Sequence, residues 1–100
     1  MNEINETQAR DLAERYLEQL FSDSGTSVVV TGVQEVDIGW VFFYQSEEYQ
    51  QSGDDRDFLY GNAPLVVDRE GHVHRTGTSL PLDDYLDRIR DEVQGEVIDG

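Results

Sequence analysis

The chain has 100 residues with 22 acidic and 7 basic side chains, and its formal charge is −15. This length fits one small domain, because two domains of half the size would each bury too little apolar surface to be stable without metals or disulfides. A charge of −15 repels phosphate, which argues against nucleic-acid binding and against docking on anionic membranes. There is no cysteine, which excludes disulfides, thiolate nucleophiles and zinc knuckles.

The first predicted element is an amphipathic helix that begins after Asn5 or Thr7 and ends in the polar residues 22–25. Apolar side chains recur three and four positions apart, a spacing that places them on one helical face. They are Ala9, Leu12, Ala13, Tyr16, Leu17, Leu20 and Phe21.

A region rich in β-branched and aromatic residues follows. Residues 28–38, interrupted by Gly32, predict either one strand with a bulge or two short strands. Residues 40–45 form the most hydrophobic stretch and predict a central strand that is buried on both faces.

A hairpin and a second helix complete the predicted elements. Residues 63–68 and 72–75 read as two strands joined by a turn that contains Gly71. The last helix is predicted to begin near residues 79–81 and to stop at Gly95.

The order of elements predicts an α+β fold in a single domain that spans residues 1–100. An N-terminal helix precedes three or four antiparallel strands and a C-terminal helix, and hairpin spacing argues against a parallel sheet. We expect both helices to cover one face of the sheet. Because residues 40–44 are apolar on both faces, a homodimer that covers the second face stays open as an alternative.

The residues that could support chemistry do not form a recognisable catalytic motif. His72 and His74 share a face of their predicted strand, and a metal site would need Asp68 or Glu70 as a third ligand. Two surface histidines on an edge hairpin are the preferred interpretation. Ser79, His72 and Asp68 lack the sequence of a nucleophile elbow. We therefore expect no metal, no cofactor and no enzymatic activity.

The polar segment 46–57 predicts a long exposed loop, and loops of this length are often functional. Its aspartates lack the spacing of a calcium-binding loop. A strong negative field speeds encounter with a basic partner. We expect the partner contacts to be Glu47, Glu48, Tyr49, Asp54, Asp55 and Asp57.

Four motifs occur in order along the chain and resemble the immunity protein 35 family, also called the YrhB-type domain. They are Gly39–Ser46 and residues 61–67, 71–73 and 77–85. The resemblance implies a small bacterial α+β protein that is encoded beside a toxin and protects the producing cell by binding it. It also implies structural roles for Trp40 and Phe43 in sheet packing.

The residues and the resemblance together predict a cytoplasmic immunity protein that neutralises a cognate, basic toxin by stoichiometric binding. The acidic N-terminus lacks the apolar run of a signal peptide, and no stretch is apolar over the length of a transmembrane helix. The alternative is a chaperone-like or general protein-interaction domain that recruits chains along the strand at residues 72–75.

Overall fold

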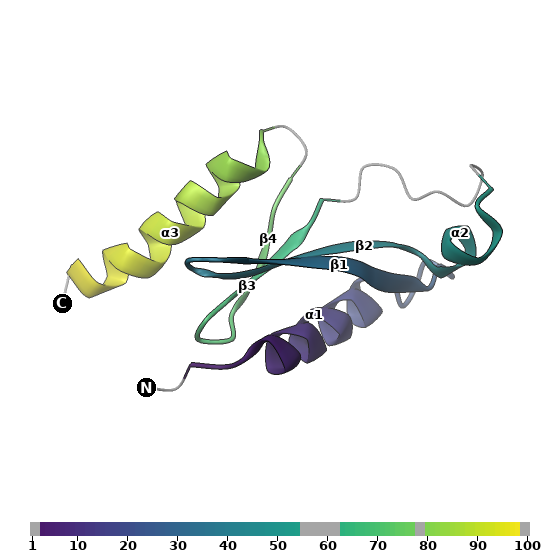
Figure 1. Ribbon diagram of the computed structural model, residues 1–100, viewed down its shortest axis with the longest axis horizontal. Helices are drawn as coiled ribbons and strands as arrows, with labels where there is room; N and C mark the ends of the chain where they lie inside the picture. Colours follow the sequence, from purple (N-terminus) through teal and green to yellow (C-terminus); the bar gives the residue numbers. More distant parts are fainter. Residues whose placement is uncertain (1–2, 55–62, 78–79, 99–100) are drawn as a thin grey trace.

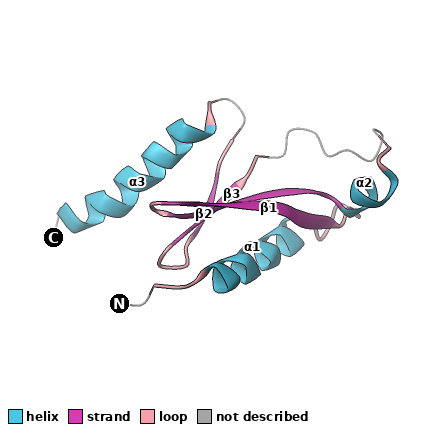
Figure 2. Ribbon diagram, viewed as in Figure 1, coloured by secondary structure: helices cyan, strands magenta, loops and turns pink. Residues whose placement is uncertain are grey.

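The computed structural model describes residues 3–54, 63–77 and 80–98, with side chains described as far as Glu92 in the last of these ranges. The elements are α1 (Glu6–Leu20), β1 (Val28–Val36), β2 (Gly39–Ser46), α2 (Glu47–Ser52), β3 (Leu65–Asp68), β4 (Val73–Arg75) and α3 (Leu82–Ile98). Figures 1 and 2 show this arrangement, which confirms the predicted α+β fold with an antiparallel sheet between two terminal helices.

α1 begins at a capping box. The Asn5 side chain accepts a hydrogen bond from the Gln8 backbone N–H at 2.8 Å, and the Gln8 side chain accepts one from the Asn5 N–H at 3.0 Å. These bonds satisfy N–H groups that a helix end leaves unpaired. Ala9, Ala13 and Leu17 are the buried residues of the helix, which confirms the predicted apolar face, whereas Leu20 at its end is 41 % exposed.

The sheet has the strand order β1-β2-β3-β4, and every neighbouring pair is antiparallel. Of the two predicted alternatives, one strand with a bulge is present, and the bulge lies between Val30 and Gly32. Gly39 follows the β1–β2 turn with φ at 155°, and a Cβ there would collide with the Val67 carbonyl oxygen. Glycine at this position therefore lets β2 start close against β3.

The prediction that both helices cover one face of the sheet is wrong, because α1 and α3 lie on opposite faces (Figure 1). Alternate residues of a strand point to opposite faces. Trp40 and Phe42 on β2 pack with α1, whereas Val41 packs with Leu86 and Ile89 of α3. The two apolar faces of residues 40–44, which had left a homodimer open as an alternative, are thus each packed against a helix of the same chain.

The prediction of a loop over residues 46–57 is wrong for residues 47–52, which form α2. The Ser46 side chain caps this helix by accepting a hydrogen bond from the Tyr49 N–H at 3.1 Å. Gly53 ends it with a positive φ of 68°. A helix of six residues is too short to show an apolar period, so only its caps could have indicated it.

α3 runs to Ile98 and continues past Gly95, where the helix was predicted to stop. A glycine inside a helix costs only about 1 kcal/mol relative to alanine. The residues after it are compatible with helix, so this cost does not end the element.

Candidate functional site

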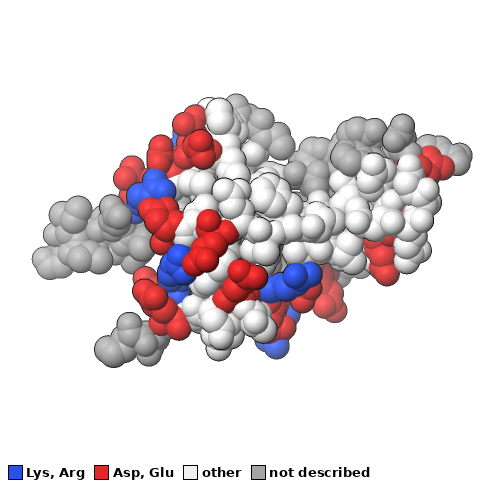
Figure 3. Space-filling view, in the orientation of Figure 1, with Lys and Arg blue, Asp and Glu red and all other residues white. Residues whose placement is uncertain are grey.

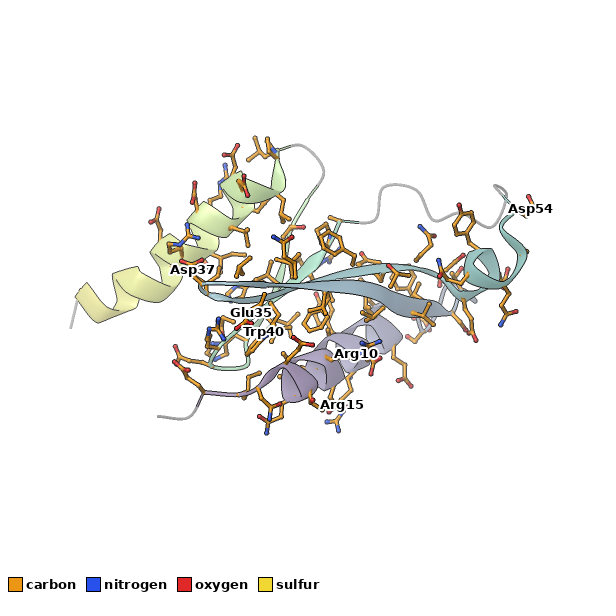
Figure 4. The ribbon with its side chains drawn as sticks, viewed as in Figure 1. Arg10, Arg15, Glu35, Asp37, Trp40 and Asp54 are labelled. Atoms are coloured by element: carbon orange, nitrogen blue, oxygen red, sulfur yellow. The ribbon has the colours of Figure 1, made fainter. Side chains whose placement is uncertain are left out.

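The predicted partner contacts that the structure describes lie on or beside α2. Glu47 and Glu48 are exposed on its first turn, and Tyr49 and Asp54 are partly exposed. Figure 4 places Asp54 beyond α2 at one end of the molecule. Asp55 and Asp57 lie outside the described residues.

A groove of about 760 Å³ lies next to α2, between α1 and β1. The Glu47 backbone N–H donates to the Ser27 carbonyl oxygen at 2.8 Å and so fixes the start of α2 beside the start of β1. We call this region, consisting of α2, residues 14–27 and the start of β1, the α2 end. The groove is lined by Arg10, Glu14, Leu17, Glu18, Phe21, Ser22, Gly25, Thr26, Ser27, Val28, Val29 and Val30.

The groove combines an apolar floor with an acidic helical wall. Leu17 is buried, and the Phe21 ring meets the Tyr44 ring edge to face at 6.2 Å between centroids. Arg10 Nε lies 3.3 Å from Glu14 Oε2, so the one arginine in this lining already has a carboxylate partner. Glu18 adds a further negative charge. The sequence predicted Leu17 and Phe21 on the apolar face of the first helix, and the closeness of this face to the start of β1 appears only once the chain is folded.

Arginines gather at the opposite end of the molecule, around the β1–β2 turn. Arg90 of α3 binds the Asp37 carboxylate with Nε and Nη2, at 2.9 and 2.8 Å. This hydrogen-bonded contact is the main reason that the pKa of Asp37 is lowered and that of Arg90 is raised. Arg69 bonds the Val36 carbonyl and lies 4.8 Å from the centre of the Trp40 ring.

Asp68 organises the neighbouring β3–β4 turn from a side chain that is only 2 % exposed. Its Oδ1 accepts hydrogen bonds from the backbone N–H groups of Glu70 and His72, both at 3.0 Å. Its Oδ2 lies 2.8 Å from His74 Nε2 and 3.4 Å from His72 Nδ1. Burial acts to raise the pKa of Asp68, but these hydrogen bonds together hold it below its usual value. We call this region, with Asp37 and its arginines, the hairpin end.

Both hairpin histidines contact the Asp68 carboxylate of the turn, and His74 is less exposed than predicted. Its side chain is 20 % exposed and its Nδ1 lies 3.9 Å from Glu92 of α3, whereas the His72 side chain is 71 % exposed. Within residues 3–54, 63–77 and 80–98, no group of three or more His, Asp or Glu side chains is arranged to hold a metal ion. Ser79, the serine of the hypothetical triad, lies outside the described residues.

The helices that the structure describes include none of sufficient length and apolar character to cross a membrane.

The family model described as Immunity protein 35 matches residues 7–88 of the chain. The chain belongs to this family. It is also 37% identical over 65 residues to the protein named "Uncharacterized protein YrhB" from Escherichia coli strain K12, an alignment that covers 64% of this chain and 69% of that protein. No solved structure matches the chain.

Family membership confirms the resemblance and favours a non-enzymatic role. The motif residues occupy structural positions. Trp40 is 3 % exposed in the core beneath α1, and a Cβ on Gly77 would press against the Tyr85 hydroxyl at the approach to α3. Phe43 faces the other side of β2 and is 38 % exposed, so it packs less completely than predicted.

Proposed function

We propose that the protein is an immunity protein that binds a cognate toxin in a stoichiometric complex and thereby neutralises it. The observation that carries this proposal is the match of the Immunity protein 35 model to residues 7–88. The charge of −15 and the acidic first turn of the capped α2 support binding to a basic surface.

The proposed contact surface is the α2 end. Glu47 and Glu48 pair with no arginine in the described part of the chain, so their charges remain available to a partner. The short helix holds them beside the α1–β1 groove, which reduces the ordering cost of binding. The proposed contacts are Glu47, Glu48, Tyr49, Asp54, Asp55 and Asp57.

The test starts with the protein encoded by the reading frame beside the gene of this chain. We expect it to inhibit growth when produced alone, and to co-purify with this chain at a fixed ratio when both are produced together. Growth inhibition that this chain does not relieve, or the absence of a complex, would contradict the proposal.

Matched charge variants then locate the surface. In one variant the α2 end loses three charges through Glu47→Gln, Glu48→Gln and Asp54→Asn. In the control, α3 loses three charges through Asp83→Asn, Asp84→Asn and Asp91→Asn, all at exposed positions. Removing charges near the contact lowers electrostatic steering, so we expect the first variant to associate about tenfold more slowly at low salt and to respond less to added salt.

Equal association rates for the two variants would remove α2 from the interface. A larger loss for the α3 variant would move the interface to the opposite face of the sheet. Either result would leave the immunity proposal itself standing, because that proposal is tested by whether this chain relieves growth inhibition.

A further inference from the structure

We propose that β1 is a docking edge, at which an extended segment of a partner protein pairs with residues 28–30 and lies in the α1–β1 groove. The segment carries arginine or lysine at alternate positions. This inference deepens the proposed function, and it rests on that function only for the statement that the partner is the toxin.

The backbone of β1 presents hydrogen-bonding groups that the sheet does not use. β1 is at the edge of the sheet, with β2 on one side only. The bond from the Glu47 N–H to the Ser27 carbonyl marks one directly bonded pair of the β1–β2 ladder. Such pairs alternate along antiparallel strands, so Val29 bonds toward β2 whereas the N–H and C=O groups of Val28 and Val30 point away from it. Within the described residues, no hydrogen bond uses these outward groups.

The two edges of the sheet differ in how well they are protected. Natural proteins protect edge strands with lysine, proline, bulges or short length. β4 has only three residues, whereas β1 has nine, VVVTGVQEV, without a basic residue or a proline. The bulge between Val30 and Gly32 disturbs the middle of β1 but leaves residues 28–30 as a regular edge.

The groove specifies the chemistry of the segment. Alternate side chains of an added strand would point toward α1, because they would lie on the same face as Val28 and Val30, which pack against the α1 core. An arginine or lysine there places its aliphatic stem along the floor at Leu17 and Phe21 and its charge beside Glu18. Arg10 does not oppose this charge strongly, since Glu14 pairs with it.

A second copy of this chain fits the edge poorly. Two molecules with a formal charge of −15 repel each other, and β1 itself brings no basic side chain to the groove of a partner. The proposed occupant is therefore a basic, extended segment of a different protein.

The test follows the backbone amides of the full-length chain by NMR during titration with a hexapeptide of alternating arginine and valine. A hexapeptide of alternating glutamate and valine is the control. We expect the arginine peptide to protect the amides of Val28 and Val30 from solvent exchange, whereas Val29, already bonded to β2, changes little. Chemical-shift changes spread over α2 and α3 without this alternation would overturn the proposal, as would equal effects of the two peptides.

Proline variants test the same edge independently. Val28→Pro removes an outward-facing N–H without breaking the ladder to β2, and we expect it to weaken binding of the arginine peptide about tenfold. Val73→Pro removes the corresponding outward N–H from β4 and should leave the affinity unchanged. Equal losses in the two variants, each with native circular dichroism, would contradict the choice of β1. If Val28→Pro does not fold, the test rests on the parent chain, in which the arginine peptide should protect the amides of Val28 and Val30 while that of Val29 changes little.

The outcomes separate this inference from the proposed function. Protection at Val28 and Val30 by the peptide, together with no complex with the neighbouring gene product, would support the docking edge and contradict the immunity role. Suppose instead that this chain neutralises the toxin, but that neither the toxin nor the arginine peptide protects the amides of Val28 and Val30 from exchange. That result would support the immunity role and overturn the docking edge.

Discussion

The hairpin end and the α2 end of the molecule carry similar acidic side chains but use them differently. At the hairpin end, Asp37 is bound by Arg90 and Asp68 is buried among hydrogen-bond donors. At the α2 end, Glu47 and Glu48 are exposed on a helical turn. Figure 4 shows Asp37 and Asp54 at opposite ends of the sheet.

The charge distribution over the surface follows the same division. In Figure 3, blue side chains lie beside red ones over the hairpin end and α1, whereas the described residues around α2 show red and no blue on the face in view. Carboxylates with fixed partners stabilise a fold, and exposed carboxylates contribute little to stability but steer association. If the α2 end is the binding surface, as proposed, stability and binding are separated along the sheet, and substitutions at the two ends should affect different measurements.

The largest expected effect is on stability at the hairpin end, from Trp40→Ala. Trp40 is 3 % exposed and packs in the α1 core beside the Arg69 guanidinium, so the loss of its ring leaves a cavity and removes the cation–π contact. We expect the free energy of unfolding to fall by about 4 kcal/mol, measured by urea denaturation. Phe43→Ala on the other face of β2 is the control, and because Phe43 is 38 % exposed its cost should be about 1 kcal/mol. Similar losses for the two aromatic residues would contradict the burial difference.

The next largest effect is expected from Asp68→Ala. This substitution removes a buried acceptor from the N–H groups of Glu70 and His72 in a partly exposed turn, and it should cost about 2 kcal/mol. Asp68→Asn keeps an acceptor oxygen and should cost less. Urea denaturation of the three proteins at neutral pH measures the order, and an alanine variant as stable as the asparagine variant would contradict it.

The lowered pKa of Asp68 also gives the stability a defined pH dependence. Because the pKa is lower in the folded chain than in the unfolded chain, the ionised carboxylate stabilises the fold fully above about pH 4, the pKa range of an unfolded aspartate. That stabilisation is lost as the pH falls through the folded-state pKa. We expect Asp68→Asn to show a shallower loss of stability on acidification than the parent chain, and parallel curves would contradict this assignment.

The sequence predicted the long elements with buried apolar residues better than it predicted α2, for a physical reason. Apolar periodicity predicted α1, the bulged β1 and the buried β2, because each buries a long apolar pattern. α2 buries none of its residues, so its sequence has no apolar periodicity from which a helix could be predicted. The placement of α3 on the second face was missed because periodicity identifies the apolar side of a helix but not the side of the sheet that it covers.

The candidate site was predicted in part for the same reason. Glu47, Glu48 and Tyr49 stood out as acidic and aromatic residues in a polar segment, and the structure places them on an exposed helix. The groove beside them is lined by residues of α1, of the turn that follows it and of the start of β1, a closeness that depends on how α1 packs against the sheet. Composition and spacing carry no information about that packing.

The smallest expected effect on stability lies at the α2 end, from Ser46→Ala. The Ser46 hydroxyl caps α2 through the Tyr49 N–H, and losing a cap of this kind costs about 1 kcal/mol. The loss should be local, since α2 buries no residue: we expect faster amide exchange at Tyr49 and Gly53, with β2 and β3 still protected. Ser22→Ala, which removes an exposed hydroxyl bonded to the Gln19 carbonyl, is the matched control and should leave α2 exchange unchanged. If the capped α2 presents the binding carboxylates, Ser46→Ala should also weaken toxin binding more than it lowers the unfolding midpoint. Faster exchange throughout the sheet would instead show that the two ends are energetically coupled, and the division between stability and binding would then be wrong.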